Sequence, residues 1–151
     1  MSADVVAGEA GRTSSEGPVS TAMGLIVLLG RVLFAAIFVM ASFGHFKSGT
    51  IGYAASQGVP MANVLVPVSG VIALAGGLSI LLGFKARFGA WLIVIFLVPV
   101  TFMMHAFWGV TDPMAAQMQQ IMFMKNVSML GGALLVSQLG AGPWSLDART
   151  G

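Results

Sequence analysis

Long apolar stretches separated by short polar ones make up most of the chain. The first stretch, residues 22–46, contains the run GLIVLLGRVLFAAIFVM and is long enough to cross a bilayer core of about 30 Å as a helix. Residues 62–84, 88–107 and 117–139 form comparable stretches and predict further membrane-spanning helices. Because only helices or closed barrels satisfy the backbone inside lipid, we expect an all-α, polytopic membrane protein folded as a four-helix transmembrane bundle.

The polar segments predict the connections and the tails. Residues 1–21 have no sustained apolar period and are expected to form a disordered cytoplasmic tail. Residues 47–61 are rich in glycine and predict a loop with a short interfacial helix near residues 51–57. The charged turn at residues 85–87 is so short that the second and third helices must run antiparallel. Residues 140–151 are expected to be a short cytoplasmic tail that is frayed over residues 145–151.

Composition supports this interpretation and excludes several functions. Hydrophobic residues make up 57% of the chain and charged residues 8%, against about 25% charged in soluble domains. The 151 residues leave room for one domain. With no cysteine, disulfides, thiolate nucleophiles and cysteine-bound clusters are excluded, so redox chemistry would need a bound cofactor. The net charge of +2 is scattered, so we expect the lipid bilayer, a protein partner or a second copy as partners, and no nucleic acid.

Basic residues in the polar segments predict the orientation. Arg12, Lys85, Arg87 and Arg149 lie on one side of the predicted bundle, whereas Lys47 lies in the loops on the other side. Because loops rich in lysine and arginine stay in the cytoplasm, both termini are expected to be cytoplasmic.

In this orientation two histidines reach the outer membrane surface. His45 and His105 end the first and third predicted helices, and Lys125, Gln120 and Trp108 lie on the same side. These side chains could form a pocket between the first, third and fourth helices for a quinone head group, because imidazole exchanges protons near neutral pH. The histidines could instead be the axial ligands of a haem b, or simply face lipid headgroups beside an aromatic belt. We predict no other metal site.

Polar residues inside the predicted helices are costly and therefore informative. Arg31 lies about 13 Å into the first helix, where it could reach the headgroups or act as a structural anchor. As an anchor it would bond a carbonyl of the fourth helix, an acidic lipid, or a hydroxyl such as that of Ser79 or Ser137. Asn126, beside Lys125, is expected to supply hydrogen bonds across the bundle.

Several stretches of the chain occur together in one known family. They are Gly30-Arg31, GHFK at 44–47, LAGGLSILLGFKARFGA at 74–90, MMHAFW at 103–108, and MFMKNVSMLGGALL at 122–135. With these stretches, residues 25–139 resemble the DoxX/DoxD-like family of small four-helix bacterial membrane proteins. Many relatives carry a glutamate where this chain has Ala73, so any role of that carboxylate is absent here.

The resemblance implies a subunit of a respiratory or detoxifying oxidoreductase system in the bacterial cytoplasmic (inner) membrane. Some relatives are linked to thiosulfate oxidation coupled to quinone reduction. We therefore expect a protein that interacts with quinone at the outer leaflet and is not catalytic alone. The alternative is a non-catalytic membrane scaffold or assembly factor, in which the histidines would tolerate substitution.

Overall fold

The computed structural model describes residues 18–150, and this part of the chain is helical with no strand. Its elements are α1 (Pro18–Ser42), η1 (Phe43–Phe46), α2 (Ser48–Ser56), α3 (Ala62–Leu82), α4 (Ala86–Met104), η2 (Phe107–Gly109), α5 (Pro113–Leu139) and α6 (Asp147–Thr150). Most of the predicted disordered tail lies outside the described residues, and its last few residues begin α1.

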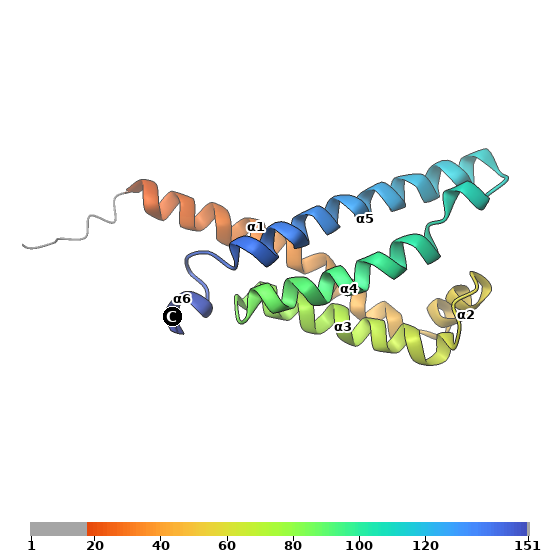
Figure 1. Ribbon diagram of the computed structural model, residues 1–151, viewed down its shortest axis with the longest axis horizontal. Coiled ribbons are helices and arrows are strands. Elements are labelled where there is room, and N and C mark those ends of the chain that lie inside the picture. Colours follow the sequence, from red (N-terminus) through yellow and green to blue (C-terminus); the bar gives the residue numbers. More distant parts are fainter. Residues whose placement is uncertain (1–17, 151) are drawn as a thin grey trace, which may run out of the picture.

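The four long helices form a bundle in which α4 lies between α3 and α5 (Figure 1). One side of α3 packs against α1 and another against α4, while α5 packs along α4. The buried core takes residues from all four helices, including Phe38, Ile80, Leu97 and Ala133. The short helix α2 lies at the end of the bundle opposite α6. The all-α fold class is thus confirmed.

Three helical segments are long and apolar enough to cross a membrane: Thr21–Phe46, Ala62–Leu82 and Ala86–Gly109. The fourth long helix, α5, has 27 residues and is therefore about 40 Å long, which exceeds the bilayer core. Glutamines in its first half and Lys125 lower its mean hydropathy, so α5 is not among the three segments that are apolar enough to cross a membrane. The chain is a polytopic membrane protein, and its fourth predicted span is α5, a less apolar helix that packs along α4.

Glycines on α3 let its neighbours approach closely. A Cβ atom at Gly76 would lie 2.9 Å from the carbonyl oxygen of Gly89 on α4. A Cβ atom at Gly77 would lie 3.0 Å from Val39 Cγ2 on α1. Ala73, one turn before Gly77, is only 1% exposed. The small residues of α3 therefore serve packing inside the bundle rather than contact between two copies.

The C-terminal segment, residues 140–150, is folded against the bundle, so the expectation of a frayed tail is wrong. Arg31 Nη1 donates to the Ala141 carbonyl at 2.8 Å, and Nη2 donates to the Trp144 carbonyl at 3.0 Å. Arg31 is 7% exposed, so it is an anchor rather than a residue that reaches the headgroups. Its partners are backbone carbonyls of the segment after α5, not a carbonyl of that helix or the hydroxyls of Ser79 or Ser137. An arginine inside an apolar bundle needs acceptors, and this segment supplies them.

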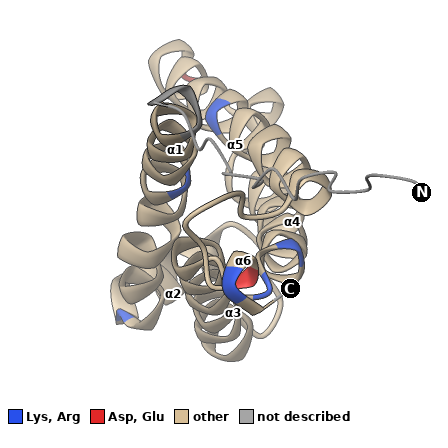
Figure 2. Cartoon of the chain, turned by 90° about the vertical axis from the view of Figure 1, so that its left-hand side faces the viewer, with Lys and Arg blue, Asp and Glu red and all other residues tan. Residues whose placement is uncertain are grey.

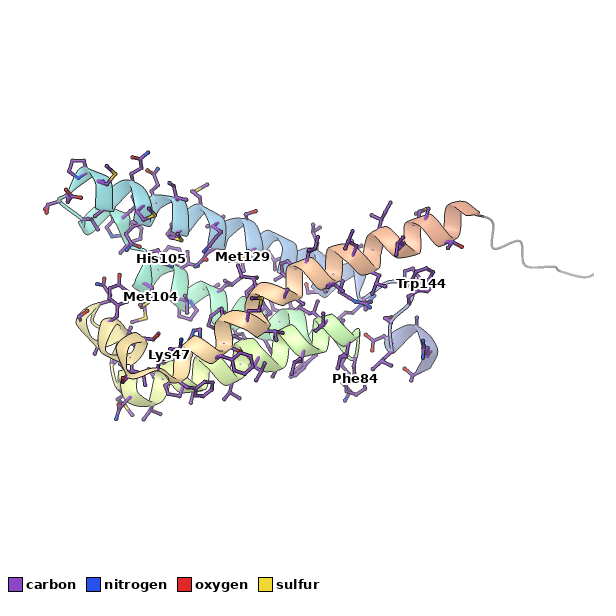
Figure 3. All side chains as sticks on the ribbon, turned by 180° about the vertical axis from the view of Figure 1, so that it is seen from behind. Lys47, Phe84, Met104, His105, Met129 and Trp144 are labelled. Carbon is purple, nitrogen blue, oxygen red and sulfur yellow. The ribbon has the colours of Figure 1, made fainter. Side chains whose placement is uncertain are left out.

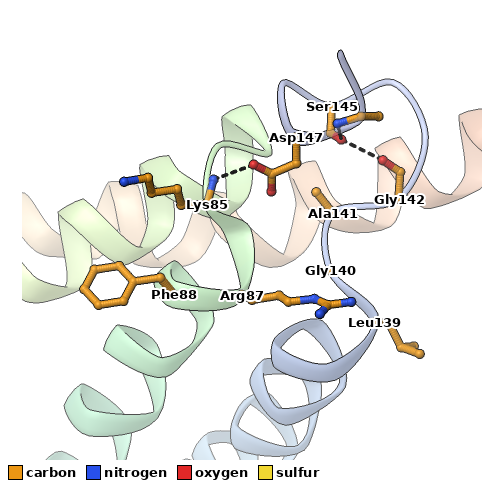
Figure 4. Close-up of a pocket in the computed structure, with 10 residues that line it drawn as sticks. Lys85, Arg87, Phe88, Leu139, Gly140, Ala141, Gly142, Ser145 and Asp147 are labelled. Atoms are coloured by element: carbon orange, nitrogen blue, oxygen red, sulfur yellow. Dashed lines mark hydrogen bonds between the residues drawn. The ribbon is translucent and has the colours of Figure 1, made fainter. Parts of the chain in front are cut away.

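Asp147 fastens the same segment to the start of α4 (Figure 4). Its Oδ1 accepts a hydrogen bond from the Lys85 amide at 2.7 Å, and its Oδ2 accepts one from the Ala86 amide at 3.0 Å. These amides open α4 and have no partner within the helix, so Asp147 acts as a cap contributed from a distant part of the sequence. A hollow of about 710 Å³ lies beside these contacts. Figure 2 shows charged residues around α6 at this end of the bundle.

Candidate ligand-binding site

A cavity of about 390 Å³ lies between α3 and α4 and is lined also by residues of η1, α2 and the α2–α3 connection. Most of its lining is aliphatic or aromatic, and its polar side chains are two histidines and two hydroxyl residues. The lining residues are His45, Thr50, Ala54, Val59, Leu65, Val66, Val68, Ser69, Ile72, Ile95, Phe96, Pro99, Val100, Met103, Met104 and His105. Cavities of this size and composition are typical sites for small ligands.

His45 enters the cavity from η1, where the chain tightens into a 3₁₀ turn at the end of α1. Its Nδ1 lies 3.1 Å from the Ala41 carbonyl oxygen, and its ring meets the Phe96 ring edge to face at 5.5 Å between centroids. Because a carbonyl oxygen can only accept, Nδ1 carries the proton and Nε2 keeps a free lone pair. The ring is thus held in one tautomer by the backbone of α1.

The absence of a side chain at Gly70 allows His45 to pack closely against α3, because a Cβ atom at Gly70 would lie 2.6 Å from His45 Cβ. We expect Gly70→Ala to push α3 away from η1 and to lower the free energy of unfolding by about 1 to 3 kcal/mol. Gly131→Ala on α5 is the matched control, since a Cβ atom there meets nothing within 4 Å. Thermal unfolding in detergent compares the two variants. Equal midpoints for Gly70→Ala and wild type would contradict the close approach.

His105 follows the last residue of α4 and is joined to α5 and α2 through hydrogen bonds. Its Nδ1 lies 2.8 Å from Gln119 Oε1, and Gln119 Nε2 donates to the Tyr53 hydroxyl at 3.4 Å. With Oε1 as its partner, Nδ1 again donates and Nε2 is again an acceptor. Figure 3 shows His105, Met104 and Lys47 at the end of the bundle opposite Phe84 and Trp144.

The mouth of the cavity is apolar. Leu65 and Val68 on α3 and Ile95 and Met103 on α4 line the cavity, yet between 37% and 57% of each residue is exposed. In a membrane, these faces of two adjacent helices contact lipid tails. A lipid-soluble molecule can therefore enter sideways from the bilayer without crossing water.

The structure brings together only some of the residues predicted for the site. His45 and His105 share the cavity, but Gln120, Lys125 and Trp108 do not line it. The cavity lies between α3 and α4, which are the second and third predicted helices. The predicted pocket lay between the first, third and fourth predicted helices, which are α1, α4 and α5. Gln120 is exposed, and Lys125 Nζ donates to Met122 Sδ at 3.3 Å.

Two further residues that the sequence singled out, Trp108 and Asn126, lie on η2 and α5. Trp108 packs edge to face with Phe107 and Phe123, with ring centroids 5.2 and 5.9 Å away, so it supports the η2–α5 contact. Asn126 is 5% exposed, but its amide forms no hydrogen bond with another described residue. The expected bond from Asn126 across the bundle is therefore not made within the described part of the chain.

Sequence reasoning missed Gln119, the residue that holds His105. The buried positions Asn126, Ala133 and Ser137 mark the inward face of α5. Counting back by seven residues from Asn126 reaches Gln119, whereas Gln120 is turned about 100° away. The signal was thus present in the periodicity of α5.

The chemistry of the site follows from the two Nε2 atoms, which form no hydrogen bond with another described residue. Each can accept a hydrogen bond or a proton from a ligand, or bind a metal through its lone pair. Among the described residues, no group of three or more His, Cys, Asp or Glu side chains could hold a metal ion. The site is best suited to a small, largely apolar ring that carries polar substituents.

Comparison with known proteins identifies the family. A family model described as DoxX matches residues 26–106, a segment that contains both histidines. Inner membrane protein YqjF of Escherichia coli (strain K12) is 32% identical over 123 residues, covering 80% of this chain and 88% of YqjF. Inner membrane protein YphA of the same organism is 32% identical over 127 residues, covering 83% of this chain and 90% of YphA.

A more distant similarity extends to a eukaryotic protein. The Surfeit locus protein 4 homolog of Schizosaccharomyces pombe is 28% identical over 125 residues, which cover 81% of this chain but 36% of that protein. No solved structure matches the chain. The family model spans more than half of the sequence and the two bacterial relatives align over most of their length, so the chain belongs to the DoxX family.

Proposed function

We propose that this protein binds the head group of a lipid-soluble quinone in the cavity lined by His45 and His105. The observation that carries the proposal is that two imidazoles, 60 positions apart in the sequence, line one apolar cavity beside lipid-facing helix surfaces. A quinone is an apolar ring with polar groups on opposite sides and a hydrocarbon tail. The ring suits the aliphatic walls, the polar groups suit the imidazoles, and the tail can leave through the apolar mouth.

The proposed role is that of a subunit that works with a redox partner. The chain has no cysteine, and its two histidines are both in the proposed binding site, so the residues offer no separate centre for electrons. The protein positions the quinone and handles its protons, and a partner protein supplies or accepts the electrons. This role fits an oxidoreductase or detoxification system of the membrane.

An organic extract and an absorption spectrum of protein purified in mild detergent test this function. We expect the wild-type extract to contain quinone at a higher ratio to protein than the extract of a His45→Phe, His105→Phe double variant. Equal ratios would mean that the quinone is only dissolved in the surrounding lipid, which favours the scaffold function. A Soret band that the double variant lacks would instead assign the histidines to a haem b.

We further propose that the protein lies in the bacterial inner membrane with both termini in the cytoplasm. The bacterial relatives are named as inner membrane proteins. The end of the bundle where α4 begins and α6 lies carries Lys85, Arg87 and Arg149. It is richer in basic residues than the end with Lys47, which favours a cytoplasmic location. The proposal requires α5 to cross the membrane, and its length allows this.

The absence of cysteine makes this orientation easy to test. Ser48→Cys places one thiol at the exposed start of α2, and Arg149→Cys places one in the exposed part of α6. In spheroplasts, a membrane-impermeant maleimide is expected to label the Ser48→Cys variant at once and the Arg149→Cys variant only after lysis. Labelling of both variants before lysis would show that the C-terminus lies outside and that α5 does not cross.

A further inference from the structure

Three of the polar side chains that line the cavity between α3 and α4 each donate a hydrogen bond to another group of the protein. His45 gives its Nδ1 proton to the Ala41 carbonyl at 3.1 Å, and Ser69 gives its hydroxyl proton to the Val66 carbonyl at 2.7 Å. Both partners are main-chain carbonyls, which only accept, so the direction of these bonds is fixed. His105 gives its Nδ1 proton to Gln119 Oε1 at 2.8 Å.

What remains for a ligand is a set of acceptors. In the tautomer that these bonds select, Nε2 of His45 and of His105 is an acceptor, and the Ser69 oxygen keeps its own lone pairs. Lysine and arginine, the strong donors, are absent from the lining. Thr50 is the remaining polar side chain of the lining, and its hydroxyl can donate or accept. A ligand with hydrogen-bond donors is therefore matched by the protein, and a ligand with only acceptors is not.

We propose that the cavity selects the reduced hydroquinone form of its ligand over the oxidised quinone, an inference that rests on the function proposed above. A hydroquinone carries two hydroxyl donors, which can bond the imidazole nitrogens. A quinone carries two carbonyl oxygens, which would face the nitrogen lone pairs and lose the hydrogen bonds they make with water or lipid headgroups. Sites built to hydrogen-bond a hydroxyl discriminate strongly against analogues that lack it.

This preference has a consequence for the bound ligand. Because binding and reduction are linked in a thermodynamic cycle, tighter binding of the hydroquinone makes the bound quinone easier to reduce by the same factor in equilibrium constant. The cavity would thus act as a place where a partner protein delivers electrons and where the hydroquinone is retained. His45 and His105 then set the specificity of the site through the lone pairs of their Nε2 atoms.

The test compares three probes of nearly equal shape on the intact protein in nanodiscs, without oxygen. The probes are a short-chain alkyl-1,4-benzoquinone, its hydroquinone, and the dimethyl ether of that hydroquinone, which has no donor. We expect the hydroquinone to bind at least about tenfold more tightly than either of the others, as measured by calorimetry. Equal or tighter binding of the quinone would overturn the preference and leave the proposed function intact. If none of the three binds, both fail.

A second variant separates hydrogen-bond polarity from shape. His45→Gln with His105→Gln places a carboxamide near each Nε2 position, and a carboxamide can both donate and accept. We expect this protein to bind the quinone and the hydroquinone within about threefold of each other. Retention of the full wild-type preference would show that the imidazole nitrogens do not set it.

Discussion

The His45→Phe, His105→Phe double variant is expected to bind the hydroquinone probe about ten to thirty times more weakly than the wild-type protein. Phenylalanine keeps an aromatic ring beside Phe96 but removes both ring nitrogens. A hydrogen bond to a neutral partner contributes about 1 kcal/mol, so two of them account for about 2 kcal/mol, which corresponds to this factor. Calorimetry in nanodiscs measures the change in dissociation constant.

Two controls make this result specific to the cavity. Gln120→Ala and Lys125→Met change polar residues of α5 that do not line it, so the affinity of each is expected to stay within about twofold of wild type. The thermal midpoint of the double variant shows whether the bundle has kept its fold. Wild-type affinity in a folded double variant would mean that the histidines do not contact the ligand.

Arg31→Met is expected to release the C-terminal segment and to lower the free energy of unfolding by about 3 to 5 kcal/mol. The substitution keeps much of the side-chain volume but removes the donors to the Ala141 and Trp144 carbonyls. Hydrogen bonds to a charged group contribute about 1.5 to 3 kcal/mol each, and buried carbonyls left without a donor are costly. Hydrogen exchange of residues 140–150, read by mass spectrometry, is expected to become much faster while α3 and α4 stay protected.

Arg87→Met is the matched control, because Arg87 is a basic residue that lies beside Gly140 but is exposed and donates no hydrogen bond to residues 140–150. We expect its C-terminal segment to exchange as slowly as that of the wild type. Slow exchange in Arg31→Met as well would mean that Asp147 and the apolar contacts hold the segment without the guanidinium.

The long helices were predictable because their signal is local and strong. A run of about twenty apolar residues has few alternatives to a helix in a membrane, and the charged turn at Lys85 forces a hairpin whatever the rest of the chain does. The start of α5 was harder to place. Asp112 caps the helix by accepting a hydrogen bond from the Ala115 amide at 2.7 Å, so α5 begins at Pro113 rather than at the predicted residue 117.

The candidate site was predictable only in part, because it depends on how helices turn about their axes. Both histidines could be placed at one end of the bundle from topology, but the apolar walls from α3 could not. The role of Gly70 and the hydrogen bond from His105 to Gln119 depend on contacts between residues far apart in sequence. The same holds for Arg31, whose partners come from a segment that looks like a polar tail when considered alone.

Photoaffinity labelling with an azido-substituted short-chain quinone tests the central claim, a quinone site between α3 and α4, most directly. The wild-type protein in nanodiscs is irradiated with the probe, digested, and the labelled peptides are identified by mass spectrometry. We expect labels on η1, α3 and α4 around His45, Ser69 and Pro99, and we expect excess hydroquinone to remove them. Labels spread over the outward faces of α1 and α5, unchanged by the competitor, would contradict the claim.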